Sequence, residues 1–155
     1  MNQNIWGSHL WFSLHTITFN YPLKPTDEDK DNYLAFFLGL KNVIPCSVCK
    51  KNYQRHLNEH PINNFLTDRR TLVYWLIDLH NMVNVEIGKK VLSYDVIIKK
   101  YEEVYGKKIN LDTDEEEMQY KYERNKKYKK IIMYFLSFLI VLLIVNFIIF
   151  YRSKK

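Results

Sequence analysis

The chain is poor in cysteine, glycine and proline, and each shortage excludes a class of structure. Its 155 residues include two cysteines, four glycines and four prolines. Two cysteines cannot form the disulfide framework that supports a small secreted domain, which agrees with a reducing compartment. Few turn-forming residues, together with apolar residues at helical rather than alternating spacing, argue against a fold of short strands. We therefore expect an all-α protein.

We expect no secretory leader from the first residues, and we expect that the positive charge is not spread over a folded surface. Residues 1–4 have neither the basic stretch nor the apolar run of a signal peptide. The formal charge of +6 would suit nucleic acid, but much of the excess lies just before an apolar segment. We therefore predict no nucleic-acid partner. The basic cluster consists of Lys121, Arg124, Lys126, Lys127, Lys129 and Lys130.

Charged residues are absent from one long segment near the C-terminus. Residues 131–151 contain 21 consecutive uncharged, mostly apolar side chains. A helix of this length can cross the hydrocarbon core of a bilayer, which is about 30 Å thick. The basic cluster upstream suits anionic lipid headgroups, and the positive-inside tendency predicts that the larger N-terminal part lies on the cytoplasmic side. The sequence thus predicts a single-pass, tail-anchored membrane protein.

Composition changes along the chain predict four regions. Residues 1–105 form the expected folded domain, and residues 106–130 form a charged linker without a core of its own. Residues 131–151 form the transmembrane helix, and residues 152–155 form a basic tail.

Five helices are expected in the folded domain from apolar spacing, capping residues and prolines. They suffice for a four-helix bundle with a short fifth helix. The expected helices are residues 5–19, residues 26–43, a segment from Pro45 to just before Pro61, a segment capped by Thr67 or Asp68 and ended by Gly88, and residues 94–105.

The two cysteines, Cys46 and Cys49, have Cys-x-x-Cys spacing directly after Pro45. A disulfide over so short a loop restricts little of the unfolded chain, so its use is chemical rather than structural. We expect Pro45 in the first turn of a helix, which puts both thiols at a helix N-terminus. The helix dipole and the ammonium groups of Lys50 and Lys51 would then lower the thiol pKa. The pair is a candidate redox centre.

The cysteine spacing alone leaves three other interpretations open. A Cys-x-x-Cys pair can be half of a zinc site, and His56 and His60 follow it, although closer to Cys49 than in a usual zinc finger. The pair can also belong to a thioredoxin-like fold, which requires strands around it. Finally, both cysteines can be inert residues of the core.

A second group of residues has the spacing of a shared helix face. Trp11 and His15 are four residues apart, as are His80 and Asn84, and Asn81 adjoins the latter pair. Each residue alone is typical of a satisfied polar residue in a core. Buried histidine and asparagine need polar partners, and aromatic rings beside them can stack on a flat heterocycle. Together with the cysteine pair, the group indicates a pocket for a planar redox cofactor.

At these positions the chain resembles the Erv/ALR family of flavin-linked sulfhydryl oxidases, particularly the small forms of large DNA viruses. The resemblance rests on three motifs in order: residues 7–15 (GSHLWFSLH), residues 45–49 (PCSVC) and residues 80–89 (HNMVNVEIGK), with Trp75 five residues before the last. It covers about residues 5–101, essentially the whole predicted domain. Ser8 stands where many family members have arginine, and the chain lacks their additional cysteine pair.

The resemblance implies a homodimeric flavoprotein that holds FAD beside the disulfide, with no metal. Two electrons pass from substrate thiols to the disulfide, then to FAD and then to molecular oxygen, which gives hydrogen peroxide. Cys46 is the expected site of attack by a substrate thiolate, and Cys49 is expected to face the flavin. The cofactor-binding positions implied are Gly7, Trp11, His15, Tyr53, Trp75, His80, Asn81, Val83, Asn84, Lys89, Lys90 and Tyr101.

These inferences predict a membrane-anchored, FAD-dependent thiol oxidase that forms protein disulfides on the cytoplasmic face, in virion assembly. Because a second cysteine pair is absent, either substrates reach Cys46 directly or a separate thiol protein relays electrons to it. The alternative is a non-enzymatic, tail-anchored adaptor whose cysteines and histidines hold zinc.

Overall fold

The computed structural model describes the backbone of residues 2–113 and 115–153, and the side chains of residues 2–113, 122–140 and 152. The described residues contain helices and no strand, which confirms the all-α prediction. Contacts divide the chain into two units, Met1–Thr113 and Asp114–Lys155. The elements are α1 (Gln3–Phe19), α2 (Asp27–Val43), α3 (Ser47–Glu59), the 3-10 helix η1 (Ile62–Phe65), α4 (Arg69–Glu86), α5 (Tyr94–Tyr105) and α6 (Glu115–Ser153).

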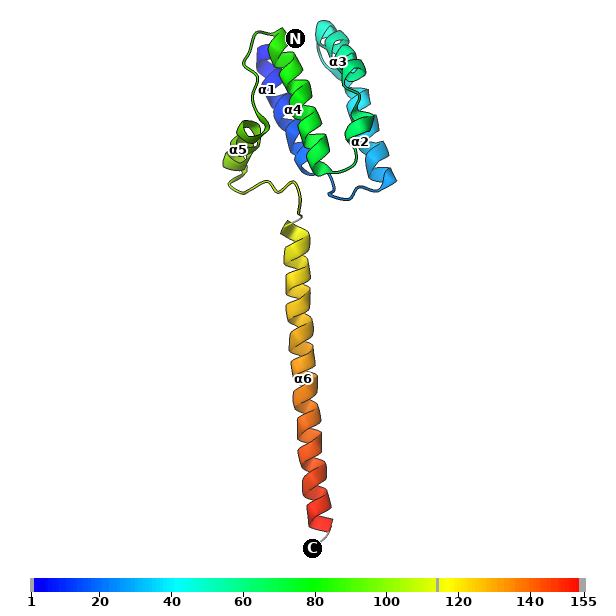
Figure 1. The fold of residues 1–155 in the computed structure, drawn as a ribbon, viewed down its shortest axis with the longest axis vertical. Coiled ribbons are helices and arrows are strands. Elements are labelled where there is room, and N and C mark those ends of the chain that lie inside the picture. The colour runs from blue at the N-terminus through cyan, green and yellow to red at the C-terminus, as the bar shows by residue number, and fades with distance from the viewer. Residues whose placement is uncertain (1, 114, 154–155) are drawn as a thin grey trace. The chain divides into compact units, whose positions relative to one another are not determined.

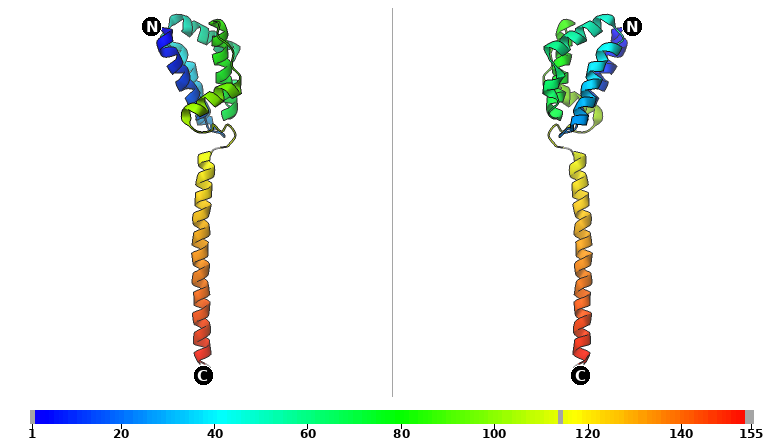
Figure 2. Two further views of the ribbon diagram at one scale, coloured as in Figure 1. Left: turned by 90° about the vertical axis from the view of Figure 1, so that its left-hand side faces the viewer. Right: turned by 90° about the vertical axis from the view of Figure 1, so that its right-hand side faces the viewer.

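In the first unit, α1 packs mainly on α4 and α2 packs on α3, while η1 and α5 contact α4 (Figures 1 and 2). One face of α4 is buried along its whole length, and the Trp75 side chain has no exposed area. It lies in the larger core cluster with Phe37 and Leu14, whereas Val73 and Tyr101 belong to a smaller cluster between α4 and α5. The bundle therefore centres on α4, which carries more of the predicted cofactor positions than any other helix.

Local capping explains where the helices begin and end. Thr26 caps α2 in a reciprocal capping box with Asp29, and Asp68 caps α4 in the same way with Thr71. Gly106 ends α5 in the left-handed conformation, with φ of 63°, which glycine adopts without steric cost. The fourth helix is therefore capped by Asp68, the second of the two residues that the sequence offered.

The start of α3 differs from the prediction. Pro45 lies outside the helix, α3 begins at Ser47, and Cys46 is its N-cap. The reason is local: the Cys46 sulfur accepts the backbone N–H of Cys49 at 3.2 Å, which is the bond that a capping side chain makes. A tight turn precedes the cap, because the Cys46 N–H donates to the Ile44 carbonyl at 2.8 Å. Both cysteines still lie at the helix N-terminus.

The first unit extends past residue 105, the predicted end of the folded domain. Ile109 and Leu111 pack on the smaller core cluster, and the Ile109 N–H donates to the Glu102 carboxylate at 3.0 Å. Apolar burial and one hydrogen bond from the backbone N–H of Ile109 hold this segment. Neither is evident from the charged residues on which the predicted boundary rested. The unit therefore ends at Thr113.

The second unit consists of α6, which includes residues 115–130 of the predicted linker and the whole predicted span of residues 131–151. Among the residues that the structure describes, no helix has a stretch that is both long and apolar enough to cross a membrane. The second half of the predicted span, residues 141–151, lies outside the residues whose side chains are described, and residues 154–155 of the basic tail lie outside the described residues altogether.

Candidate functional site

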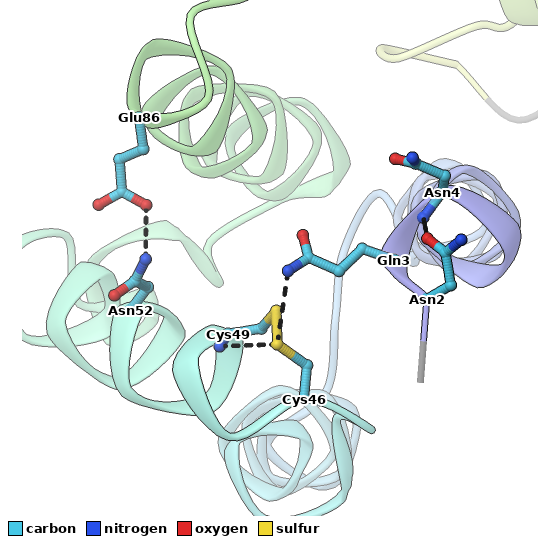
Figure 3. The surroundings of a disulfide bond; sticks show 7 residues. All are labelled: Asn2, Gln3, Asn4, Cys46, Cys49, Asn52 and Glu86. Carbon is cyan, nitrogen blue, oxygen red and sulfur yellow. Dashed lines mark hydrogen bonds between the residues drawn. A yellow bond between two sulfur atoms is a disulfide. The ribbon is translucent and has the colours of Figure 1, made fainter.

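Cys46 and Cys49 form a disulfide across the first turn of α3, with 5.2 Å between their Cα atoms (Figure 3). Both residues are partly buried against the larger core cluster. The Cys46 sulfur accepts two N–H groups, one from the Cys49 backbone at 3.2 Å and one from the Gln3 side chain at 3.7 Å. The N-terminal turn of α1 is thus brought to the N-terminus of α3. The redox roles assigned to the two cysteines stay predictions.

Four of the predicted cofactor positions meet where α1, α4 and α5 come together. The rings of Trp11 and His80 are stacked, with centroids 4.0 Å apart and planes 4° from parallel. His15 Nε2 and His80 Nδ1 are 3.0 Å apart, at hydrogen-bond distance. The Tyr101 ring lies 5.2 Å from the His15 ring. We call Trp11, His15, His80 and Tyr101 the aromatic cluster.

Burial keeps both histidines of the aromatic cluster neutral at pH 7. Desolvation, then the neighbouring His80 and Lys100, lowers the pKa of His15 to about 3. Desolvation, then Lys100 and Lys89, lowers the pKa of His80 to about 4. Burial also raises the pKa of Tyr101, which keeps its hydroxyl protonated. The cluster is therefore an uncharged aromatic surface with lysine ammonium groups nearby.

These residues fit a flavin nucleotide. His15 is 1% exposed, yet its Nδ1 atom has no hydrogen-bond partner within the protein, so the ring offers a buried polar atom to a ligand. Flat aromatic side chains suit the stacking of a planar ring system, and nearby lysines suit a diphosphate. The aromatic cluster and Lys89 therefore match a ligand with flat rings and negative charge.

Asn81 and Asn84 use much of their hydrogen-bonding capacity to hold the loop after α4. The Asn81 side chain donates to the Leu92 carbonyl at 2.8 Å and accepts the Leu92 N–H at 3.1 Å. Asn84 donates to Asn81 Oδ1 at 3.3 Å, and its carbonyl accepts the Lys89 N–H at 2.7 Å. Both asparagines thus position the loop that carries Lys89 and Lys90, whose side chains are exposed.

The other four predicted cofactor positions lie outside the aromatic cluster. Trp75 donates from Nε1 to the His60 carbonyl at 2.9 Å, and Tyr53 donates to the Phe37 carbonyl at 2.9 Å, both inside the core. Burial raises the pKa of Tyr53. Val83 is half-buried on α4. Gly7 lies on α1, where an added Cβ would meet no atom within 4 Å.

The geometry gives no support to the zinc alternative. Both cysteine sulfurs are bonded to each other, so neither is a thiolate. His56 Nε2 faces the Glu86 carboxylate at 3.0 Å, and His60 Nε2 lies 3.9 Å from Asp78. In the part of the chain that the structure describes, no group of three potential metal-binding side chains is gathered.

Sequence reasoning missed three residues around the site. Gln3 reaches the Cys46 sulfur, Lys100 lies close enough to affect both histidines, and Glu86 anchors α3 to α4. Lys100 could have been found from the sequence, because it adjoins Tyr101 on the predicted fifth helix. Gln3 and Glu86 carry no signal in the sequence, because their partners are distant along the chain and meet them only in the folded bundle.

Solved structures share this helical arrangement. The FAD-binding domain of Erv1 from Saccharomyces cerevisiae is 25% identical, with a TM-score of 0.62 over 66% of this chain and 96% of that one. The yeast Erv1 core is also 25% identical, with a TM-score of 0.61 over 64% of this chain and 83% of that one.

Curated relatives carry the same enzyme name. A probable FAD-linked sulfhydryl oxidase of Acanthamoeba polyphaga mimivirus is 42% identical over 103 residues, which are 66% of this chain and 72% of that protein. The mitochondrial FAD-linked sulfhydryl oxidase ERV1 of Saccharomyces cerevisiae is 29% identical over 54% of this chain and 43% of that protein. An African swine fever virus FAD-linked sulfhydryl oxidase is 25% identical over 67% of this chain and 82% of that protein.

The match to a family model covers more than half of the chain and spans all three motifs except Gly7. The model is that of the Erv1 / Alr family, and it matches residues 8–104, from the first turns of α1 to the end of α5. The resemblance predicted from the motifs is thereby confirmed, and the chain belongs to the Erv1/Alr family.

Proposed function

We propose that this chain oxidises protein thiols to disulfides at Cys46–Cys49, with FAD as its cofactor and molecular oxygen as the final acceptor. The chain is an FAD-linked sulfhydryl oxidase by family and by the names of its relatives. The observation that carries the proposal is the disulfide at the N-terminus of α3, beside a bundle whose buried aromatic cluster fits a flavin. Release of hydrogen peroxide follows when oxygen takes up two electrons and two protons.

The cysteine chemistry follows from thiol–disulfide exchange. A substrate thiolate attacks the Cys46 sulfur, the bond between Cys46 and Cys49 breaks, and Cys49 leaves as a thiolate. A second substrate thiolate attacks the substrate sulfur of the mixed disulfide, which releases Cys46 as a thiolate and the substrate as a disulfide. The N–H groups of Cys49 and Gln3 at the Cys46 sulfur stabilise that negative charge.

The chain's own residues would hold FAD through the aromatic cluster and the lysines around it. Trp11 and His80 offer stacked rings, His15 offers its unpartnered Nδ1 atom, and Lys89 and Lys100 offer positive charge. Bound there, FAD would supply an acceptor for the electron pair of the reduced cysteines, whose disulfide is restored as that pair leaves them, and a route for the pair to oxygen. The neutral state of both histidines keeps their side chains from repelling the lysines nearby.

The physiological electron donor in this proposal is a separate thiol protein that relays electrons from substrates. The support is that the chain has two cysteines, which form one disulfide, so it carries no second pair of its own. We further propose a homodimer that acts in virion assembly. Its support is the family resemblance and the similarity to enzymes of mimivirus, African swine fever virus and an iridescent virus.

Membrane attachment through residues 131–151, with the redox domain on the cytoplasmic side, belongs to the same proposal. The segment carries no charge, and it follows a cluster of basic residues. Within it, the apolar side chains of residues 131–136 and 138–140 are exposed on α6, as a lipid-facing helix requires.

The decisive test is the purified full chain. It should be yellow, hold FAD in solution and consume oxygen with a dithiol. The variant Cys49→Ala should keep FAD, because the aromatic cluster is unchanged, and should lose turnover by several orders of magnitude, because no disulfide can form. Absorption spectra and oxygen uptake check both. A colourless, folded chain, or undiminished turnover in Cys49→Ala, contradicts the proposal.

A further inference from the structure

One carboxylate at the end of α4 gathers three side chains of α3. Glu86, the last residue of α4, accepts from Asn52 Nδ2 at 3.1 Å, and its carboxylate lies 3.0 Å from His56 Nε2. Arg55 forms an ion pair with the same carboxylate. Figure 3 shows the Asn52–Glu86 bond in the same view as the disulfide. We call these four residues the α3–α4 tie.

His56 is the buried residue of the α3–α4 tie. The His56 side chain is 1% exposed, and desolvation, followed by the charge of Arg55, lowers its pKa. His56 Nε2 lies 3.0 Å from the Glu86 carboxylate, which accepts, and 3.2 Å from the Arg55 guanidinium, which donates, while His56 Nδ1 has no hydrogen-bond partner in this structure. The ring is therefore held by its contacts at Nε2, while the Arg55 guanidinium balances the charge of Glu86, whose side chain is 24% exposed.

The α3–α4 tie connects the helix that carries the disulfide with the helix that carries His80. Asn52 follows Cys49 by three residues, so it sits on the next turn of α3 above the disulfide. Glu86 follows Asn84 by two residues on α4, the helix that also carries His80. At the C-terminal end of α3, Trp75 donates to the His60 carbonyl, and His60 Nε2 lies 3.9 Å from Asp78 of α4. Glu86 thus holds α3 to α4 through Asn52, one turn beyond Cys49, and through Arg55 and His56 in the second half of the helix.

We propose that Glu86 is a positioning residue for thiol oxidation: its carboxylate holds α3 against α4 and so fixes Cys49 relative to the cofactor. This inference rests on the proposed function. Reactions between held groups depend steeply on their geometry, and a displacement of about 1 Å can slow them about a hundredfold. Glu86 touches neither sulfur, so its effect is exerted through Asn52, Arg55 and His56.

The test compares Glu86→Ala with Glu86→Gln and with a matched control, Glu59→Ala, in the full chain loaded with FAD. Glu59 also pairs with Arg55, but it lies on α3 itself and cannot link that helix to α4. Each protein is mixed with dithiothreitol without oxygen, and the bleaching of the flavin absorption is timed. Glu86→Ala should slow bleaching about tenfold at saturating dithiol with an unchanged KM. Glu86→Gln, whose amide oxygen still accepts, should recover most of the rate, and Glu59→Ala should match the natural chain.

Hydrogen exchange gives a readout that is independent of turnover. Amides of residues 47–56 should exchange faster in Glu86→Ala and at the natural rate in Glu59→Ala. Should Glu86→Ala fail to fold, Asn52→Ala removes one bond of the tie and should produce a smaller slowing in the same direction. Equal bleaching in the natural chain and these variants overturns the role of Glu86 while leaving the oxidase intact. A natural chain that never bleaches contradicts the proposed function instead.

Discussion

At the scale of single residues, the bond between His15 and His80 joins two rings that burial keeps neutral. Each neutral imidazole has one donor and one acceptor nitrogen, so the contact of 3.0 Å between them is a donor–acceptor pair. A second proton on either ring would place a positive charge in a buried site, close to Lys100. Folding therefore opposes protonation at both residues.

This opposition predicts a loss of stability in acid. The folded-state pKa values, about 3 for His15 and about 4 for His80, lie below the unfolded value of 6.5. The stability that these residues contribute is therefore complete above pH 6.5 and is lost as the pH falls, toward about 4 for His80 and toward about 3 for His15. Each buried histidine contributes a slope of up to about 1.4 kcal/mol per pH unit in that window. Urea unfolding at several pH values should show this decline.

The variant His15→Gln isolates one of the two contributions. It cannot be protonated, so its unfolding free energy should fall less steeply between pH 6.5 and 4 than that of the natural chain, although its stability at neutral pH is lower. Identical slopes for the two proteins would show that His15 is not held neutral by burial.

At the scale of elements, α3 is unusual because a disulfide sulfur occupies its N-cap. Serine, threonine, aspartate and asparagine commonly fill this position, since their oxygens accept an N–H of the first turn. Here the Cys46 sulfur accepts the Cys49 N–H at 3.2 Å. The same sulfur therefore caps the helix, belongs to the disulfide and accepts a bond from Gln3 on α1.

A pair of substitutions separates the cap from the disulfide. Cys46→Ser and Cys46→Ala both abolish the disulfide and should both lack turnover. The serine hydroxyl can still accept the N–H of residue 49, so Cys46→Ser should be about 1 kcal/mol more stable than Cys46→Ala. Chemical denaturation of the two variants measures the difference. Equal stabilities would mean that the side chain of residue 46 contributes no cap.

Local signals explain which elements of the fold could be predicted from the sequence. The cap at Thr26 and the helix at residues 94–105 follow from short-range chemistry, and the structure has both. For the fourth helix the sequence left Thr67 and Asp68 open, and the structure has Asp68. The start of α3 at Pro45 was wrong, because proline at a first turn is one choice among several and a cysteine cap is rare.

The candidate site, like the fold, could be predicted from the sequence only in part. The spacing of Trp11 with His15, and of His80 with Asn84, placed each pair on one helix face, and the family motifs supplied the rest. Their meeting depends on how α1 packs on α4, which spacing along one helix does not determine. Bonds over long sequence separation, such as Gln3 with Cys46 and Asn52 with Glu86, depend wholly on the assembled bundle.

At the scale of the whole molecule, the two units differ in how their apolar residues are used. The first unit buries them around α4, with Trp75, Phe37 and Leu72 fully enclosed. On α6 the described apolar side chains are exposed, including Phe135, which is 61% exposed. A helix that exposes such residues needs an apolar environment or a partner to cover them. Our proposal of a membrane anchor gives them lipid.

The anchor can be distinguished from electrostatic attachment by its response to salt. Basic residues upstream would hold the chain on an anionic membrane through forces that salt screens, whereas insertion of residues 131–151 depends on apolar burial. The full chain, reconstituted with vesicles that contain anionic lipid, should stay with them in flotation at about 1 M salt, where the Debye length is about 3 Å. A chain that lacks residues 131–155 should detach, since it keeps the basic cluster and loses the apolar segment. If salt releases the full chain as well, the basic cluster alone holds it at the surface, and the tail anchor must be abandoned.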